Sequence, residues 1–384
     1  MNVVRSTPLL AAALMTVLAC GEDSAPTEPE ARPAHEVAAS GAAPTFRMVS
    51  TGTRGCGVTS DRRAYCWGSS NQFVGGTLRF RQVAVGGSHI CGVTTGDVVY
   101  CWGSNVTGQL GDGTTTSRLT PAPVKGALRF RTVRAGNWHT CAVTYSNQAY
   151  CWGRNAEGQL GDSTEAGRRA RPVKVVGGHS WRHVVPGGNH TCGVTNSDKA
   201  YCWGAGGSGQ IGDGKTVLHR RWPRAVAGGL SFRQVAAGLA HSCGLTYADR
   251  AYCWGSNGDG RIGDGTTTTR LKPVAVAGGL RFAGIGPGGN HTCAVTTSNR
   301  AYCWGDNAFG QLGDGTTSDR RVPVNVAGGL LIDRISASRG IFDSFSCGLT
   351  TGDKAYCWGD NASGQLGDGT TTDRSTPVAV LGPT

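Results

Sequence analysis

Fourteen cysteines, arranged as seven pairs along the sequence, have the clearest chemistry in this chain. The two cysteines of each pair are ten residues apart. The pairs are Cys56 and Cys66, Cys91 and Cys101, Cys141 and Cys151, Cys192 and Cys202, Cys243 and Cys253, Cys293 and Cys303, and Cys347 and Cys357. An even number of cysteines at constant spacing predicts disulfides in an exported protein. Metal binding is the alternative, but no CxxC sequence occurs. We therefore predict seven disulfides and no metal site.

Histidine recurs two residues before the first cysteine in five units, as His89, His139, His190, His241 and His291. A ring of imidazoles could hold a metal ion or an anion. However, Arg54 and Phe345 take the corresponding positions in the first and last units. A repeated position usually solves a repeated structural problem, so we predict that each histidine hydrogen-bonds the main chain of its blade.

Arginines follow the recurring Gly-Asp-Gly loops at a nearly constant offset. Arginine makes planar, bidentate contacts with carboxylate, sulfate or phosphate, so these side chains are candidates for partner binding. The alternative is a local ion pair with the loop aspartate, or a solvated rim. The candidates are Arg118, Arg168, Arg221, Arg270, Arg320 and Arg374. The aspartates themselves are typical of Asx turns rather than of a calcium loop.

The last unit departs from the others because it carries an insertion, SRGIFDSFS, before Cys347. A symmetric scaffold can acquire specificity where it breaks its own pattern. We therefore add Arg339, Phe342 and Phe345 to the candidate partner-binding residues. Trp138 and Trp222 are two further departures. The tryptophans of the recurring Cys-Trp-Gly segments are predicted to pack inside the protein rather than to stack on a ligand.

These residues lie in a unit that recurs about every fifty residues, and one copy reads AYCWGDNAFGQLGDGT at Ala301–Thr316. Each unit holds three to four short β segments joined by glycine-rich turns, and long amphipathic helical patterns are absent. In an antiparallel hairpin, Cys141 would lie opposite Cys151, close enough for a disulfide. We therefore predict an all-β, seven-bladed β-propeller. Its C-terminal strand is expected to complete the blade that the N-terminal strands begin, which would remove a free sheet edge.

The first residues are typical of an export signal. Residues 1–19 combine Arg5, a largely apolar stretch and a small residue before Cys20. This pattern is similar to a bacterial lipobox, so Cys20 is the predicted lipidation site, with simple cleavage as the alternative. Residues 20–45 are acidic and rich in proline and alanine, and they predict a disordered tether before a propeller at 46–384. The formal net charge of the chain is +12, which suits anionic partners.

Three repeated motifs are Gly-x-x-His-x-Cys-(Ala/Gly)-Val-Thr, Ala-Tyr-Cys-Trp-Gly and Gly-Gln-Leu-Gly-Asp-Gly. They resemble the repeat of the regulator of chromosome condensation family, and the resemblance spans residues 46–380. It implies a seven-bladed propeller. Intracellular members act as nucleotide-exchange factors for small GTPases, so the resemblance also implies that role as one alternative. The paired cysteines depart from those members and look like an exported bacterial variant, which argues against it.

No nucleophile elbow, phosphate-binding loop or dinucleotide fingerprint occurs in the sequence. We therefore predict a non-enzymatic, surface-anchored lipoprotein of the cell envelope whose rigid propeller binds a protein or an anionic polysaccharide. A regulator of a small GTPase and a secreted inhibitor of an enzyme are the alternatives. We expect no cofactor, no nucleic-acid partner, a membrane contact only through lipidated Cys20, and a monomer.

Overall fold

The computed structural model describes residues 44–68, 71–340 and 344–382. These residues form twenty-eight β-strands and one short 3-10 helix, η1 (Ala327–Gly329). Residues 1–43, which include the predicted signal segment, Cys20 and almost all of the predicted tether, lie outside the described part of the chain. Within that described part, no helix combines the length and the apolar character needed to cross a membrane.

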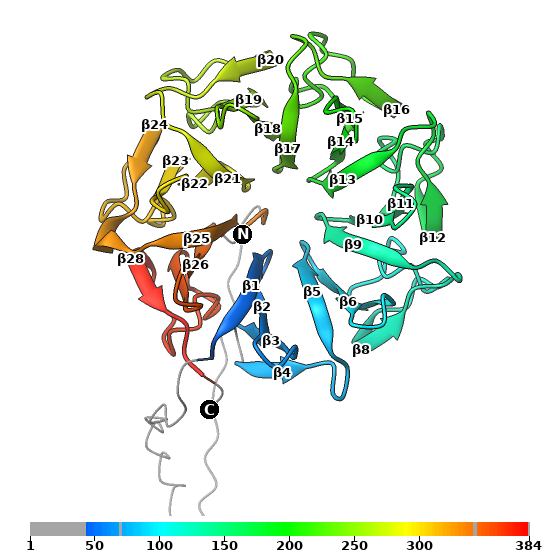
Figure 1. The fold of residues 1–384 in the computed structure, drawn as a ribbon, viewed down its shortest axis with the longest axis horizontal. Coiled ribbons are helices and arrows are strands. Elements are labelled where there is room, and N and C mark those ends of the chain that lie inside the picture. Colours follow the sequence, from blue (N-terminus) through cyan, green and yellow to red (C-terminus); the bar gives the residue numbers. More distant parts are fainter. Residues whose placement is uncertain (1–43, 69–70, 341–343, 383–384) are drawn as a thin grey trace, which may run out of the picture. The chain divides into compact units, whose positions relative to one another are not determined.

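The strands form seven antiparallel sheets, each built from four strands that are consecutive in the chain. Figure 1 shows the sheets as blades around a central axis, with the first strand of each blade nearest that axis. The predicted all-β, seven-bladed propeller is therefore confirmed.

Blade 1 contains β1 (Phe46–Thr51), β2 (Gly55–Thr59), β3 (Ala64–Trp67) and β4 (Gln72–Val74), and blade 2 contains β5 (Phe80–Val85), β6 (His89–Thr94), β7 (Val99–Gly103) and β8 (Arg118–Pro123). Blade 3 contains β9 (Phe130–Ala135), β10 (His139–Thr144), β11 (Ala149–Arg154) and β12 (Arg168–Lys174). Blade 4 contains β13 (Trp181–Pro186), β14 (His190–Thr195), β15 (Ala200–Ala205) and β16 (His219–Ala225). Blades 5 to 7 contain β17 (Phe232–Ala237), β18 (His241–Thr246), β19 (Ala251–Gly255) and β20 (Arg270–Ala275); β21 (Phe282–Pro287), β22 (His291–Thr296), β23 (Ala301–Gly305) and β24 (Arg320–Asn325); and β25 (Ile332–Ala337), β26 (Phe345–Thr350), β27 (Ala355–Gly359) and β28 (Arg374–Ala379).

The sequence of a strand determines its place in the blade. All six residues of β10, HTCAVT, are buried, because the neighbouring blades cover both faces of a second strand. The outer strand β12, RRARPVK, has no fully buried residue. Its Pro172 is tolerated there because an edge strand does not need every N–H group for pairing. Small and apolar strands therefore lie inside the ring, and strands rich in arginine and proline lie at its rim.

The seven predicted disulfides are present, and each one joins the second and third strands of a blade. In blade 3, Cys141 lies opposite Cys151 in the antiparallel register, with their Cα atoms 4.1 Å apart. Both cysteines are completely buried. The constant spacing of ten residues thus follows from a hairpin with the same register in every blade.

Removing one of these disulfides is expected to destabilise the propeller. Replacing Cys141 and Cys151 together with alanine should lower the free energy of unfolding by about 2–4 kcal/mol, because the reduced chain gains conformational entropy when it unfolds. Guanidinium-induced unfolding of the purified protein measures this change. Cys20→Ser, which leaves all seven pairs intact, should not move the unfolding midpoint. An unchanged midpoint in the double variant would contradict the expectation.

The apolar core lies between neighbouring blades, and the GQLGDG loop of one blade completes it. Leu110 of blade 2 and Trp152 of blade 3 belong to one buried cluster. The main-chain carbonyl of Gln109 accepts hydrogen bonds from Trp152 Nε1 and from Thr140 Oγ1, both at 2.9 Å. Equivalent bond pairs reach the carbonyl oxygens of Gln210, Arg261 and Gln311. The recurring tryptophans are therefore packing residues, as predicted.

The ring closes differently from the prediction, because neither terminal strand enters the other's blade. β1 pairs with β2, and β28 pairs with β27. The physical reason is β4, which gives blade 1 a fourth strand of its own, so no strand has to be borrowed. Blades 7 and 1 meet as other neighbours do, with Leu366 and Trp67 in one buried cluster. The Phe46 N–H also donates to the carbonyl of Asp353 at 2.9 Å.

Candidate partner-binding face

The recurring histidines lie in the seams between blades. His139 Nε2 is 2.8 Å from Thr191 Oγ1 of the next blade. The Thr191 hydroxyl donates to the carbonyl of Gln159 at 2.7 Å, so His139 donates to that hydroxyl through Nε2–H. Burial lowers the pKa of His139 to about 3, so its ring is neutral near pH 7. The same contact recurs for His89, His190, His241 and His291.

These histidines have the predicted structural role, although each contacts a hydroxyl of the next blade rather than the main chain of its own. Their five rings are fully enclosed. Among the described residues, no group of three or more His, Cys, Asp or Glu side chains is placed to hold a metal ion.

Most of the loop arginines pair with the aspartate of their own loop. Arg320 Nη2 lies 2.9 Å from Asp314 Oδ2. The same pair is formed by Arg118 with Asp112, Arg270 with Asp264, and Arg374 with Asp368. In blades 3 and 4 the paired arginines are Arg169 and Arg220, each beside a predicted candidate. Four of the six loop candidates, Arg118, Arg270, Arg320 and Arg374, thus make the local pair that the sequence left open as the alternative.

The paired aspartate and a buried asparagine both make hydrogen bonds that fix the conformation of the loop. Asn307 Nδ2 lies 3.0 Å from the carbonyl of Thr316 and 3.3 Å from Asp314 Oδ1, and its Oδ1 accepts from the Leu312 N–H at 2.9 Å. Asp314 Oδ1 accepts from the N–H and hydroxyl of Thr316, which is an Asx turn. Burial alone would raise the pKa of Asp314, but the hydrogen bonds from Thr316 and Arg320 outweigh it and lower that pKa. The charge of this aspartate is therefore balanced by contacts within its own loop.

The two remaining loop candidates, Arg168 and Arg221, do not form the ion pair with a loop aspartate within the described part of the chain. Arg221 Nε lies 3.6 Å from Glu165 Oε1, and its guanidinium carbon lies 6.0 Å from the centre of the exposed Trp222 ring. Both groups are largely exposed, so this ion pair contributes little to stability. Arg168 borders a cavity of about 540 Å³, hereafter the blade 3 cavity. The cavity is lined by Thr107, Arg154, Ala156, Ala166, Gly167 and Arg168.

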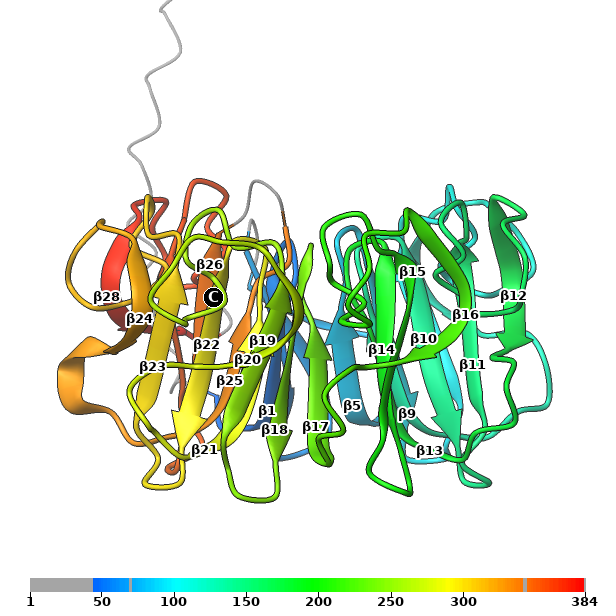
Figure 2. The same ribbon diagram turned by 90° about the horizontal axis from the view of Figure 1, so that it is seen from above.

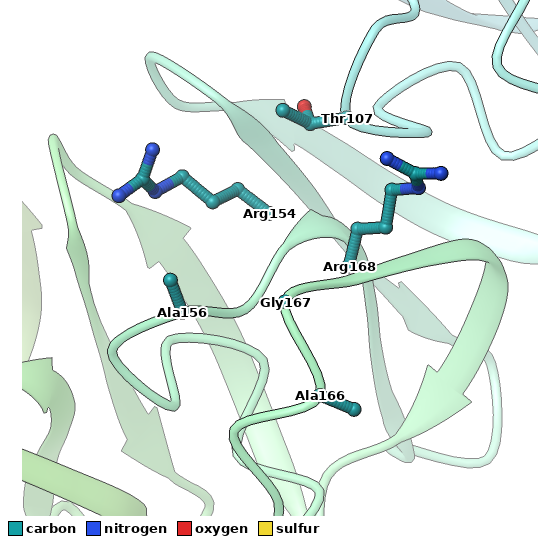
Figure 3. A pocket seen from close by; sticks show the side chains of 6 residues that line it. All are labelled: Thr107, Arg154, Ala156, Ala166, Gly167 and Arg168. Atoms are coloured by element: carbon teal, nitrogen blue, oxygen red, sulfur yellow. The ribbon is translucent and has the colours of Figure 1, made fainter.

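The blade 3 cavity lies where the loop of blade 2 meets blade 3, and Figure 3 shows the residues that line it. Arg154 ends β11 and Arg168 begins β12, while Thr107 reaches in from the neighbouring loop. Arg154 Nη2 lies 2.8 Å from Glu157 Oε1. Trp138 adjoins the cavity, because its carbonyl accepts from Thr107 Oγ1 at 3.1 Å and from the Arg154 N–H at 3.0 Å. The Trp138 side chain is 38% exposed. Two arginines therefore line the concave site, and a residue with an exposed indole adjoins it through its main chain.

Sequence reasoning did not select Arg154, although the repeat contains the signal. Its counterparts in the other blades that have this loop are Ser104, Ala205, Ser256, Asp306 and Asp360. A comparison of equivalent positions, rather than of the motif itself, would have found it.

At two equivalent positions, the face that carries the cavity has basic residues in blade 3 and acidic residues in blades 6 and 7. In an antiparallel blade, the connections from first to second strand and from third to fourth strand leave the same edge; we call this the loop face, and Figure 2 shows the two faces edge-on. Blade 3 places Arg154 and Arg168 there. The equivalent positions of blades 6 and 7 hold Asp306, Asp319, Asp360 and Asp373. Burial, together with the charge of Asp319, raises the pKa of Asp306, which shows how close these carboxylates are.

The insertion in the last unit gives three different outcomes. Phe345 is completely buried in the cluster with Phe46 and Trp67, so the prediction that it contacts a partner is wrong. It occupies the histidine position and fills core space between blades 7 and 1. Phe342 lies outside the described residues. Arg339 reaches toward blade 3, where its Nη1 donates to the carbonyl of Ala135 at 3.1 Å.

A second cavity, of about 640 Å³, follows the central axis and is lined by the first strands of all seven blades. Its lining includes Arg134, Arg334 and Arg339. Of these, only Arg339 was selected from the sequence. We call this second cavity the central channel.

Seven blades, each with a disulfide between its second and third strands, form a closed β-propeller that presents loops on one face. The chain belongs to the RCC1-like domain family, whose family model matches residues 70–383.

Two solved structures illustrate the shared fold. Human WBSCR16 superposes with a TM-score of 0.72 at 20% identity, covering 82% of this chain and 84% of that one. Prp20p from Saccharomyces cerevisiae, described with its binding properties to Gsp1p and histones, gives a TM-score of 0.68 at 22% identity over 79% of this chain and 77% of that one. Likenesses at these identities show the fold.

Two curated relatives match shorter stretches. Human E3 ubiquitin-protein ligase HERC2 is 34% identical over 102 residues, which are 26% of this chain and 2% of the ligase. The ultraviolet-B receptor UVR8 of Arabidopsis thaliana is 31% identical over 101 residues, which are 26% of this chain and 23% of the receptor. This chain therefore spans less than a quarter of each of these relatives.

Proposed function

We propose that this protein is a non-enzymatic, exported binding scaffold whose loop face binds a protein partner at the blade 3 cavity. The observation that carries the proposal is a concave site lined by Arg154 and Arg168, next to Trp138, whose main-chain carbonyl contacts the lining residues Thr107 and Arg154 and whose indole is exposed. Each of Trp138, Arg154 and Arg168 replaces a smaller or acidic residue found at the same position in other blades. Exposed tryptophan and arginine are the side chains that most often dominate the energy of protein interfaces.

The charge distribution favours a protein over an anionic polysaccharide. A polyanion that covered the loop face would meet Arg154 and Arg168 on blade 3 but Asp306, Asp319, Asp360 and Asp373 on blades 6 and 7. A protein surface can present both signs of charge, so it can complement both sides of the face. Protein binding is also what the description of yeast Prp20p states for that protein.

Export and anchoring through a lipid on Cys20 are part of the same proposal. The seven disulfides support export, because such bonds persist in oxidising compartments and are rare in the cytosol. An enzyme as the bound protein would make this chain an inhibitor, and a small GTPase would make it an exchange-factor-like regulator. The identity of the captured protein distinguishes these roles.

Pull-down with the full-length, oxidised protein tests the proposal. The bait is incubated with cell-envelope and secreted proteins of the source organism, and bound proteins are identified by mass spectrometry. The same experiment uses a variant with Trp138→Ala, Arg154→Ala and Arg168→Ala. We expect one stoichiometric protein whose affinity for this variant is at least about ten-fold weaker, because interface residues of these types each contribute on the order of 1–2 kcal/mol.

The matched control changes an aromatic residue and an arginine on the other side of the same face. Phe309→Ala with Arg321→Ala removes the exposed pair of blade 6 and should bind like the unchanged protein. Equal capture by the triple variant would overturn the proposed surface. Retention on a sulfated polysaccharide that is lost in the triple variant, with no protein captured, would assign the surface to a glycan instead.

A further inference from the structure

The walls of the central channel are mostly closed by side chains that bridge neighbouring blades. Gln82 Nε2 donates to the carbonyl of Val133 at 2.8 Å, and Gln234 Nε2 donates to the carbonyl of Ile285 at 3.1 Å. Both glutamines hold the third position of the innermost strand of their blade. In these blades the channel-facing side chain therefore satisfies the main chain of the next blade.

Blade 6 leaves the wall open. Its innermost strand, β21, has Gly284 at the third position. The other blades place a side chain there: Met48, Gln82, Thr132, His183, Gln234 or Arg334. A Cβ added to Gly284 would meet nothing within 4 Å. Gly286, two residues later, also lines the channel without a side chain. Blade 6 therefore leaves space at Gly284 in the wall of the cavity of about 640 Å³.

Three guanidinium groups from two other blades face this space. Arg134 lies in β9, Arg334 lies in β25, and Arg339 follows β25. All three line the cavity. Arg334 Nε lies 3.1 Å from Asp333 Oδ2 on the surface, but Arg134 and Arg339 pair with no carboxylate among the described residues. Arg339 Nε is buried and has no hydrogen-bond partner within that part of the chain.

The three arginines line the same cavity, so their charges act on one another. Burial and, second, the charge of Arg134 lower the pKa of Arg339 to about 10. The side chain of Arg134 is exposed to the channel, but its reduced solvation inside the ring and then the charge of Arg334 lower its pKa. Guanidinium groups are cationic at pH 7, so the like charges that line this cavity repel one another.

A neutral donor adjoins the same group of cations. His183 Nε2 accepts from the Val235 N–H at 3.1 Å, so the neutral ring carries its proton on Nδ1. Burial, with the charge of Arg134 next, lowers the pKa of His183 to about 4, which keeps the ring neutral. The channel thus combines two cations that have no carboxylate partner among the described residues, Arg134 and Arg339, with a neutral N–H donor. Guanidinium groups bind oxyanions by charge-assisted, often bidentate hydrogen bonds.

We propose that the central channel binds a small oxyanion, a molecule or group that bears carboxylate, phosphate or sulfate, between Arg134, Arg334 and Arg339 beside Gly284. The anion would offset the charges of Arg134 and Arg339, which pair with no carboxylate among the described residues, whereas Arg334 pairs with Asp333. This site is distinct from the blade 3 cavity, so it goes beyond the proposed binding of a protein on the loop face.

Two substitutions test the site because each installs a residue that other blades already carry. Arg134→Ala places there the alanine of Ala84 and Ala236, and Gly284→Gln places there the glutamine of Gln82 and Gln234. Isothermal titration calorimetry of the full-length protein at low ionic strength measures the affinity for citrate, inorganic phosphate and sulfate. We expect saturable binding of at least one anion, and at least about ten-fold weaker binding in each variant because a charge-assisted contact or the space for it is lost.

Controls separate binding from general effects of salt and folding. KCl at matched ionic strength should give no saturable heat, and Arg79→Ala, an exposed arginine outside the channel lining, should bind like the unchanged protein. Without anion, Arg134→Ala should melt no lower than the unchanged protein, because it removes a repulsive charge. A tetraglutamate peptide tests whether a polypeptide can supply the anion. Equal affinities of the unchanged protein and Arg134→Ala for every probe, or no saturable binding at all, would overturn the proposal.

Discussion

Acidification from pH 7 toward pH 4 is expected to unfold the propeller steeply. Burial lowers the pKa of His89, His139, His190 and His291 to about 3, and that of His241 well below its ordinary value of 6.5. The unfolded chain binds a proton at each of these rings near pH 6.5, whereas the folded chain does not. Stability is therefore fully present above about pH 6.5 and is lost as the pH falls toward 3.

The expected slope is large because several buried rings act together. Each buried neutral histidine contributes about 1.4 kcal/mol per pH unit, so the five seam histidines contribute about 7 kcal/mol per pH unit between pH 6 and 4. His183, whose pKa burial lowers to about 4, adds to this slope. Domains of ordinary stability have about 5–15 kcal/mol to lose. Urea-induced unfolding at several pH values measures the free energy of unfolding and hence its slope. The carboxylates with lowered pKa, such as Asp314, add a loss in the same direction only at lower pH.

Single histidine variants make this expectation specific. His190→Gln should reduce the slope by about one sixth, the share of one ring among the five seam histidines and His183. It should also lower the free energy of unfolding at pH 7 by about 1–3 kcal/mol if the amide cannot reproduce the bond to Ser242. His219→Gln, which changes a histidine that is 39% exposed and lies outside the seams, is the comparison variant. A slope that is the same in all three proteins would show that the seam histidines do not control acid unfolding.

The repeated features of this fold could be predicted from the sequence because they recur. Constant spacing between Cys141 and Cys151 indicated a hairpin register, and that register is present. The histidines were assigned a structural role, although their partner, a hydroxyl such as Thr191, belongs to the next blade. The sequence of a single unit does not show which neighbouring unit supplies a contact. Seam contacts were therefore predicted in kind but not in detail.

The individual features were harder to predict because they depend on the closed ring. Phe345 looked like a surface residue in an insertion, but the seam between blades 7 and 1 buries it. Arg134 sits within an ordinary strand sequence, and only the ring brings it to face Arg334 and Arg339. Arg154 became a candidate for partner binding only because the structure places it in one cavity lining with Arg168 and in contact with the main chain of Trp138. In a repeat protein, a comparison of each strand position across all blades is the analysis that would have revealed these departures.

A methyl group added to the GQLGDG loop is expected to disrupt the seam between blades. Gly313 has φ +70, and a Cβ there would lie 2.7 Å from Nε1 of Trp358, which is completely buried in the next blade. Gly313→Ala therefore pays about 1–2 kcal/mol for the left-handed backbone and about 1–3 kcal/mol for overpacking. We expect a loss of about 2–5 kcal/mol in the free energy of unfolding, measured by guanidinium-induced unfolding.

Gly315 in the same loop provides the matched comparison. It has φ +85, but the nearest atom to an added Cβ would be Thr376 Cγ2 at 4.0 Å. Gly315→Ala therefore carries only the backbone cost of about 1–2 kcal/mol. The difference between the two variants isolates the contact between the loop of blade 6 and Trp358 of blade 7. Equal losses would mean that this contact does not hold the blades together, and the recurring Gln-Leu-Gly sequence would then need another physical explanation.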